Sequence, residues 1–423
     1  MPQRVRSIDL LRGLIMVLMA VDHVRVFAGL PAGGPTAGLF FTRWITHFCA
    51  PGFVFLAGTS AYLYGARACV PALARFLLGR GGFLIVLELT VLRAAWTFNG
   101  DAWNYNLAGV IWMIGWCLLA LAALVRLPLG VVASLGAAIV LAHNAIGPLA
   151  FAGGETGALA RVLYTGGDFR LGGDSPRIVV LYSLVPWVGL IALGYAFGRV
   201  MTMPGPARDG WCVRIGVVAT LAFLVLRGFN VYGDPRPWNP APPGAVSPLA
   251  PLFSFLNTAK YPASMLFLLM TLGPSIAALP LLERWRGGIG RVLEVFGRVP
   301  LFYYVLHIPA IHVAAIVVSL LRTGAVSPWL FANHPMEPGP PPPDTVWSLP
   351  LLYLVTAVVV TLLYFPLPLV CGRQGATAPL GGLDVVRRPN GRAGCRDSRP
   401  SSNRSVAGVG CLVARRKRGS TDV

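Results

Sequence analysis

Long apolar runs separated by short polar segments dominate this sequence up to about residue 370. A stretch of about 20 apolar residues is long enough to cross a lipid bilayer as one α-helix. Only 12% of the residues are charged, whereas a soluble domain carries about 25%. So few charges cannot cover a water-facing surface. We therefore expect a polytopic membrane protein of the all-α class, a bundle of about ten transmembrane helices.

The apolar runs place the expected helices at 8–27, 39–65, 73–97, 106–125, 128–146, 177–201, 211–229, 259–281, 292–321 and 347–371. Fourteen Lys and Arg lie in the connections on the side of the N-terminus, against ten spread over the much longer opposite loops. Because positive residues accumulate on the cytoplasmic side, both termini are expected in the cytoplasm and the protein in the cell inner membrane. The net charge of +19 fits this anchoring to the lipid bilayer, so no nucleic-acid partner is expected.

The composition divides the chain in two. Residues 1–371 form the expected membrane domain. The segment 372–423 is rich in Gly, Arg, Ser and Pro and has no aromatic residue, which is typical of a basic, disordered tail. A misread frame of a GC-rich gene is the alternative for this tail. The seven Cys form no CxxC pair, so neither a disulfide framework nor a metal site is expected.

One apolar run ends in the polar sequence "IMVLMAVDHVR", which contains Asp22 and His23. A charged residue in a membrane segment costs about 2.5–3.5 kcal/mol or more and is a functional hypothesis by default. With the N-terminus inside, His23, His47 and His312 fall in the outer half of their helices and His307 lies deeper. These polar groups are predicted to line a shared cavity that opens to the outside.

Four motifs follow one another along the chain. The first is the pattern S-I-D-x-x-R-G followed by nine residues and His, in Ser7–His23. The others are "RWITHFCAPGFVFLAGTSAYLYG" (Arg43–Gly65), "NTAKYPASMLFLLMTLG" (Asn257–Gly273) and "FGRVPLFYYVLHIPAIH" (Phe296–His312). Together and in this order they resemble the heparan-alpha-glucosaminide N-acetyltransferase-like family of transmembrane acyltransferases, and above all its bacterial branch.

The resemblance implies transfer of an acetyl group from cytoplasmic acetyl-CoA to an amine or hydroxyl of a sugar-like acceptor on the far side of the membrane. Acetyl-CoA is then a cosubstrate, and no cofactor is tightly bound. The lysosomal relatives acetylate a terminal glucosamine. They carry their catalytic His between the first two helices and an Asn where His23 stands. Because residues 28–42 contain no His, the base here is expected to be His23 or His47.

The chemistry assigns roles to the remaining polar residues. A neutral imidazole is well matched to deprotonating the acceptor, and Asp22 is a candidate to orient the imidazole of His23 or of His47. Cations are needed for the CoA phosphates. The candidates are Arg12, Arg298 and Lys260. Donors are needed for the developing oxyanion, and polar groups for the acceptor. The candidates are Ser264, Tyr303, Tyr304, His307 and His312.

Two other classes of function remain open at this point. A proton-coupled transporter or flippase of a small solute or lipid-linked sugar would also place His and Asp inside the membrane. No internal repeat supports it, and it does not explain the four motifs. A b-type haem protein needs facing His pairs, but His23 and His47 fall at different depths and His307 and His312 are five residues apart. The sequence leaves open whether the protein is a homo-oligomer.

Overall fold

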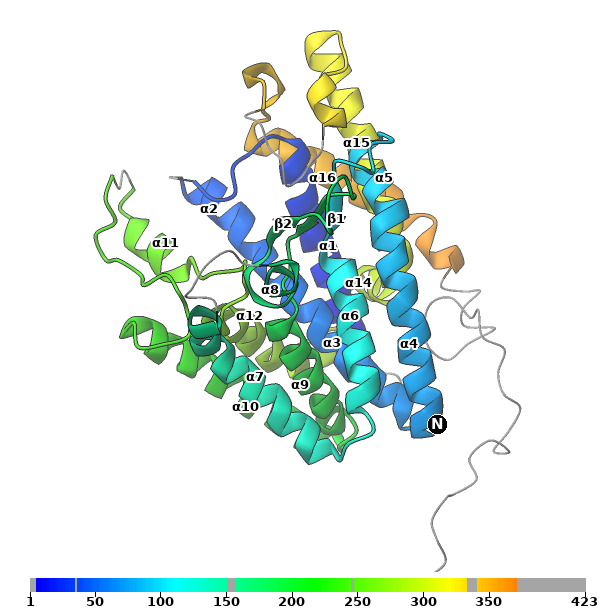
Figure 1. Cartoon of the computed structure of the whole chain (residues 1–423), viewed down its shortest axis with the longest axis vertical. Helices are drawn as coiled ribbons and strands as arrows, with labels where there is room; N and C mark the ends of the chain where they lie inside the picture. The colour runs from blue at the N-terminus through cyan, green and yellow to red at the C-terminus, as the bar shows by residue number, and fades with distance from the viewer. Residues whose placement is uncertain (1–4, 35, 151–156, 245–246, 333–340, 371–423) are drawn as a thin grey trace, which may run out of the picture. The chain divides into compact units, whose positions relative to one another are not determined.

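Helices make up most of the protein (Figure 1). The computed structural model describes residues 5–34, 36–150, 157–244, 247–332 and 341–370. The tail expected at 372–423 lies outside these residues, so its predicted disorder stays a prediction.

The first half of the chain contains α1 (Arg6–Phe27), α2 (Ala37–Trp44), the 3-10 turn η1 (Ile45–Phe48), α3 (Cys49–Gly65), α4 (Val70–Leu87), the π-helical turn η2 (Glu88–Leu92), α5 (Arg93–Thr97), α6 (Val110–Leu124) and α7 (Leu129–Ala150). The second half contains α8 (Ala158–Ala160), the π-helical turn η3 (Arg161–Thr165), α9 (Val185–Met201), α10 (Gly205–Gly228), α11 (Ala250–Leu256), α12 (Met265–Ala277), α13 (Leu279–Arg284), α14 (Gly288–Arg298), α15 (Pro300–Thr323), the 3-10 turns η4 (Pro328–Phe331) and η5 (Pro343–Thr345), and α16 (Leu349–Tyr364).

Seven helical segments of the described residues are long and apolar enough to cross a membrane. They are Ala37–Gly65, Val70–Thr97, Leu129–Ile146, Gly205–Gly228, Met265–Arg284, Pro300–Thr323 and Leu349–Val370. The apolar helices α6 and α9 are shorter, with 15 and 17 residues. Each of the ten expected ranges contains a helix, which confirms a mostly helical, multi-pass membrane protein. The number of ten spans and the cytoplasmic position of both termini stay predictions.

A small three-stranded sheet was not expected. Its strands β1 (Asn106–Ala108), β3 (Ile178–Val180) and β2 (Gly167–Phe169) lie in that order, with β1 parallel and β2 antiparallel to β3. The expected helices at 106–125 and 177–201 were therefore wrong at their first residues. There the chain is extended, because pairing between segments far apart in the sequence satisfies its backbone groups.

Two more helix boundaries were wrong for reasons that affect the site. The expected helix 292–321 is broken between α14 and α15, because Pro300 lacks an N–H and begins a new helix. The expected helix at 259–281 begins only at Met265, where Ser264 caps the N-terminus of α12 with its side chain. Lys260 therefore lies in the non-helical segment before α12 rather than in a helix.

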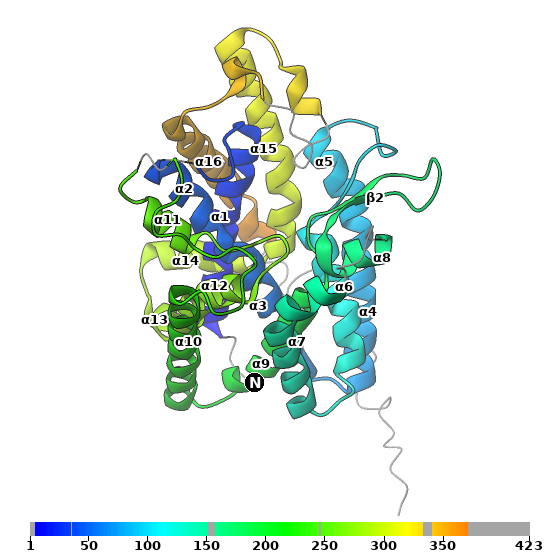
Figure 2. The same cartoon turned by 60° about the vertical axis from the view of Figure 1, so that its left-hand side comes forward.

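Helix α1 lies inside the bundle, in contact with α3, α14, α15 and α16, as Figure 2 illustrates from the side. It crosses α14 at glycines on both helices. A Cβ atom added to Gly13 would lie 1.9 Å from the carbonyl oxygen of Leu293, and one added to Gly297 would lie 1.8 Å from that of Asp9. Close backbone contact at small residues is typical of helix packing in membranes, where association relies on van der Waals contact. The glycine of the S-I-D-x-x-R-G motif is thus a packing residue.

We expect the substitution Gly297→Ala to lower the stability of the protein by about 1–3 kcal/mol, because the methyl group would have to displace backbone atoms of α1. Thermal denaturation of the protein in detergent measures the effect. Gly79→Ala in α4 is the matched control, since a Cβ atom there meets nothing within 4 Å. Equal stability of the two variants would contradict the close packing of α1 on α14.

Candidate active site

Two histidines from α1 and α15 form a pair. Nδ1 of His23 lies 2.6 Å from Nε2 of His307, and the two rings stack with their centroids 4.8 Å apart. The expectation that His307 lies deeper than His23 was therefore wrong. Because α15 begins at Pro300 and not at Val292, His307 falls two turns into its helix, opposite the C-terminal end of α1.

The hydrogen bonds of His307 define which ring nitrogen of His23 carries the free lone pair. Nδ1 of His307 lies 2.6 Å from the carbonyl oxygen of Tyr304 and 3.2 Å from that of Tyr303. A carbonyl oxygen only accepts hydrogen bonds, so Nδ1 of His307 carries a proton. In a neutral ring Nε2 of His307 then accepts from Nδ1–H of His23, and the lone pair of His23 lies on its Nε2. No hydrogen bond from the described residues engages that atom.

Aromatic side chains surround the half-buried His23. The indole of Trp96 meets its ring edge-on with centroids 4.9 Å apart, and Tyr304 does so at 6.3 Å. The structure thus brings the predicted residues His23, Tyr304 and His307 together. Trp96 had not been recognised, because a Trp in an apolar run gives no sign of its partner.

Asp22 lies in a cluster of charges. Its carboxylate is 3.1 Å from the guanidinium of Arg25 and 3.7 Å from Nζ of Lys260. Burial lowers the pKa of Lys260, but Tyr261 and Asp22 outweigh it and raise that pKa above its ordinary value, so the side chain is a stable ammonium. Among the described residues, neither His23 nor His47 forms a hydrogen bond with Asp22. Asp22 therefore acts on His23 only as a nearby charge.

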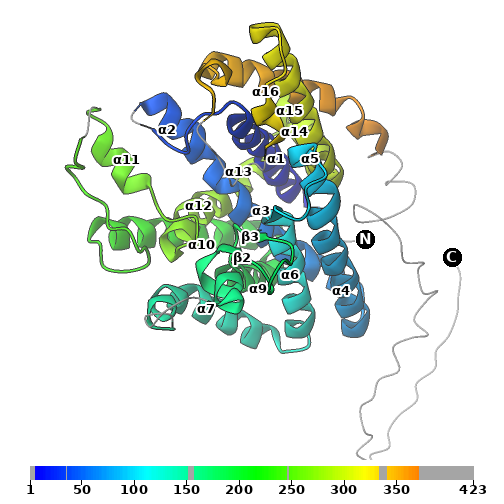
Figure 3. The same cartoon turned by 45° about the horizontal axis from the view of Figure 1, so that its top comes forward.

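His47 lies apart from this pair, at the wall of a cavity of about 370 Å³. The cavity is lined by Ala32, Gly33, Gly34, Phe40, Arg43, Trp44, His47, Pro242, Ala250, Phe253, Ser254 and Asn257. It therefore lies between α2 with η1 and α11, which stand beside each other in the bundle (Figures 2 and 3). His47 is buried, and neither ring nitrogen has a hydrogen-bond partner within the described part of the chain.

The segment between α10 and α12 is held by a buried ion pair. The guanidinium of Arg227 lies 3.8 Å from the carboxylate of Asp234, and both side chains are almost fully buried. Ser264 is buried too, and its hydroxyl donates to Asp234 at a distance of 2.7 Å. The predicted substrate contact Ser264 is thus engaged in this network and in capping α12.

His312 packs among aromatic rings one turn beyond His307. Its ring stacks on Phe98 with centroids 4.0 Å apart and lies 4.8 Å from Phe27. Its Nδ1 lies 3.2 Å from the carbonyl oxygen of Ala95. Within the described residues these contacts join α15 to α1 and α5, so the structure places His312 in the packing between helices.

Of the three predicted CoA-binding cations, Arg12 and Arg298 lie at the same end of α1 and Lys260 lies apart from them. Arg12 donates to the hydroxyl of Ser60 at 2.8 Å and to the carbonyl oxygen of Gly297 at 3.2 Å. Arg298 pairs with Glu294. Lys260 instead contacts Asp22, which is ten residues farther along α1 and so about 15 Å away.

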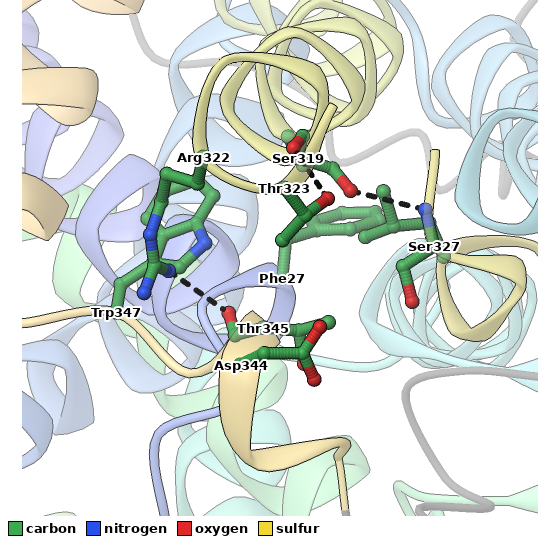
Figure 4. A pocket seen from close by; sticks show the side chains of 10 residues that line it. Phe27, Ser319, Arg322, Thr323, Ser327, Asp344, Thr345 and Trp347 are labelled. Carbon is green, nitrogen blue, oxygen red and sulfur yellow. Dashed lines mark hydrogen bonds between the residues drawn. The ribbon is translucent and has the colours of Figure 1, made fainter. Parts of the chain in front are cut away.

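A much smaller cavity lies between α15 and the segment before α16. Figure 4 shows Phe27, Ser319, Arg322 and Trp347 among the side chains around it. Its volume of about 10 Å³ holds about one water molecule. It is therefore too small for an acyl donor or a sugar.

Comparisons with known proteins assign the chain to a family. No curated protein matches it in sequence. The model of the family described as heparan-alpha-glucosaminide N-acetyltransferase, catalytic, matches residues 4–231, more than half of the chain. That range contains the first two motifs, with His23 and His47, and ends before Lys260 and His307. The chain therefore belongs to the family of the heparan-alpha-glucosaminide N-acetyltransferase catalytic domain, a family of membrane acetyltransferases.

Proposed function

We propose that this protein moves an acetyl group from cytoplasmic acetyl-CoA to an amine or hydroxyl of a sugar-like acceptor on the outer side of the cell inner membrane. His23 is the general base. The observation that carries the proposal is the 2.6 Å hydrogen bond between His23 and His307, which leaves the lone pair of His23 on Nε2. Membership of an acetyltransferase family supplies the reaction class.

In the proposed mechanism, Nε2 of His23 accepts the proton of the acceptor as its nitrogen or oxygen attacks the thioester carbonyl. The new positive charge on His23 is stabilised by its hydrogen bond to His307 and by the neighbouring carboxylate of Asp22. A general base of this kind contributes about 10²–10⁴-fold to a rate. When the tetrahedral intermediate collapses, the C–S bond breaks and His23 returns the proton to the departing thiolate. The products are the acetylated acceptor and CoA.

The negative charge on the carbonyl oxygen needs a donor. Of the three hydroxyl candidates, Ser264 already donates to Asp234, and the ring of Tyr303 stacks on His307. Tyr304 has its ring 6.3 Å from that of His23 and is the donor we assign. A preorganised donor at such a position is worth about 10²–10³-fold in kcat.

The acetyl donor, acetyl-CoA, would approach from the N-terminal end of α1, opposite the end that carries His23. Arg12 lies there but is engaged with Asp9, Ser60 and Gly297. The side chain of Arg298 is 37% exposed, against 16% for that of Arg12. Arg298 is therefore the better candidate for the CoA phosphates, and the cytoplasmic position of this end is part of the proposal.

Release of the CoA thiol tests the proposal. The purified protein in detergent should release thiol from acetyl-CoA when an amino sugar such as glucosamine is added, in step with acetylation of the sugar. A transporter would move its solute without cleaving the thioester. Absence of thiol release with every amine and alcohol acceptor offered would contradict the proposed function.

A further inference from the structure

Two residues that line the cavity carry buried polar atoms without partners among the described residues. Nε1 of Trp44 and both ring nitrogens of His47 are buried and have no partner in the part of the chain that is described. Arg43 lines the same cavity, and its guanidinium forms no hydrogen bond or ion pair with a described residue. An unsatisfied buried polar group costs about 1–3 kcal/mol, so a ligand rich in acceptor atoms would recover that cost.

The charges around this cavity favour an anion. Three cations, Lys260, Arg43 and Arg236, lie close enough to His47 to act on it electrostatically, against the single carboxylate of Asp22. That carboxylate is already paired with Arg25 and Lys260. Charge-assisted hydrogen bonds from Arg to a carboxylate or phosphate are about twice as strong as neutral ones.

The other walls fit the flat face of a small organic ring. The rings of Phe40 and Phe253, which both line the cavity, stack on each other with centroids 4.4 Å apart, and Gly33 and Gly34 add lining without side chains of their own. A volume of about 370 Å³ lies in the range of small-molecule sites, about 300–1,000 Å³. Apolar walls with a few convergent donors are typical of such sites.

The cavity is linked to the histidine pair through one side chain. Lys260 acts on His47 and is also paired with Asp22, the residue next to His23. The turn η1, which carries His47, also packs against α1, which carries His23, so a ligand anchored at Arg43 and His47 would lie near α1.

From these observations we infer that the cavity is an anion-binding subsite for the acceptor, which is a sugar that carries a phosphate or carboxylate group. This inference rests on the proposed function, because only an acetyltransferase has an acceptor. It also gives His47 a new role as a donor that binds the anionic group, rather than as the base.

Binding in the absence of acetyl-CoA tests the inference separately from catalysis. Calorimetric titration of the full-length protein in detergent would compare glucosamine 6-phosphate with glucosamine and glucuronate with glucose, which lack the anionic group. At least one anionic sugar should bind about tenfold or more tightly than its counterpart without that group, and inorganic phosphate should compete with the phosphorylated sugar. Comparison of the phosphorylated sugar with glucuronate tells whether the site prefers a phosphate or a carboxylate.

Substitutions locate the site. Arg43→Gln and His47→Gln should each raise the Kd of the anionic sugar about tenfold or more, while Arg43→Lys should retain part of the affinity because it keeps the charge. Arg170→Gln, in an exposed loop, is the matched control and should bind as the wild type does. In acetyl transfer, His47→Gln should raise KM with little effect on kcat, which separates a binding residue from a base.

Equal affinity for sugars with and without the anionic group, or unchanged binding in Arg43→Gln and His47→Gln, would overturn the inference. Transfer to acceptors without an anionic group, with no dependence on Arg43, would overturn it and leave the proposed function standing. Arg43-dependent binding of an anionic sugar without any acetyl transfer would support the anion site and remove the proposed function instead.

Discussion

Replacing His23 by Ala is expected to lower the turnover of acetyl transfer about 10²–10⁴-fold, because the acceptor loses its general base. The imidazole also packs against Trp96 and His307, so some stability is lost as well, but the loss of turnover in the folded protein should be much larger than packing alone would cause. Turnover with acetyl-CoA and the preferred acceptor is measured beside thermal denaturation in detergent. Near-normal turnover of a folded His23→Ala protein would contradict the assignment.

His307 provides a matched test of the same arrangement. The amide oxygen of Gln can accept the hydrogen bond from Nδ1–H of His23, whereas Leu of similar volume cannot. We therefore expect His307→Gln to retain more activity than His307→Leu, with similar stabilities. Equal loss in both would show that the hydrogen bond to His23 does not contribute to turnover.

Replacing Arg227 by Ala is expected to cost about 3–5 kcal/mol of stability, because it leaves the buried carboxylate of Asp234 without its countercharge. The guanidinium also donates to four carbonyl oxygens, those of Ser254, Phe255, Arg236 and Asn257. These bonds shape the segment between α10 and α12, which carries Asn257 at the cavity and Lys260 beside Asp22. The variant should therefore bind the acceptor more weakly as well.

Thermal denaturation measures this effect, with Arg170→Ala as the control. Arg170 is exposed, and such substitutions usually change stability by less than about 0.5 kcal/mol. A change of similar size in Arg227→Ala would show that the buried pair does not hold this segment.

Hydrophobic patterning predicted the helices of this protein better than their exact ends. The apolar runs located a helix in each expected range, because a membrane leaves few alternatives to a helix with satisfied backbone groups. The break at Pro300 can be read from the sequence, because proline favours the first turn of a helix, and it brings His307 to the level of His23. The strands at 106–108 and 178–180 depend on pairing between distant segments, which no local pattern reveals.

The candidate site could be predicted in part. His23 and His307 were singled out because polar groups are costly in an apolar helix, but their direct contact depends on how α1 and α15 align. Arg43 was not considered, although it lies four residues before His47 and so on the same face of a helical segment. That spacing predicts that Arg43 and His47 lie side by side. The role of Asp234 was not predictable, because its partner Arg227 lies seven residues away across a loop.

Transfer of label across a membrane tests the central proposal most directly. The purified protein would be reconstituted into liposomes filled with an amino sugar acceptor, and acetyl-labelled acetyl-CoA would be added outside. We predict that acetylated sugar carrying the label accumulates inside liposomes with the wild-type protein and is reduced about 10²–10⁴-fold with His23→Ala. Label that stays on CoA with the wild-type protein, or that reaches the enclosed sugar equally fast with His23→Ala, would contradict it.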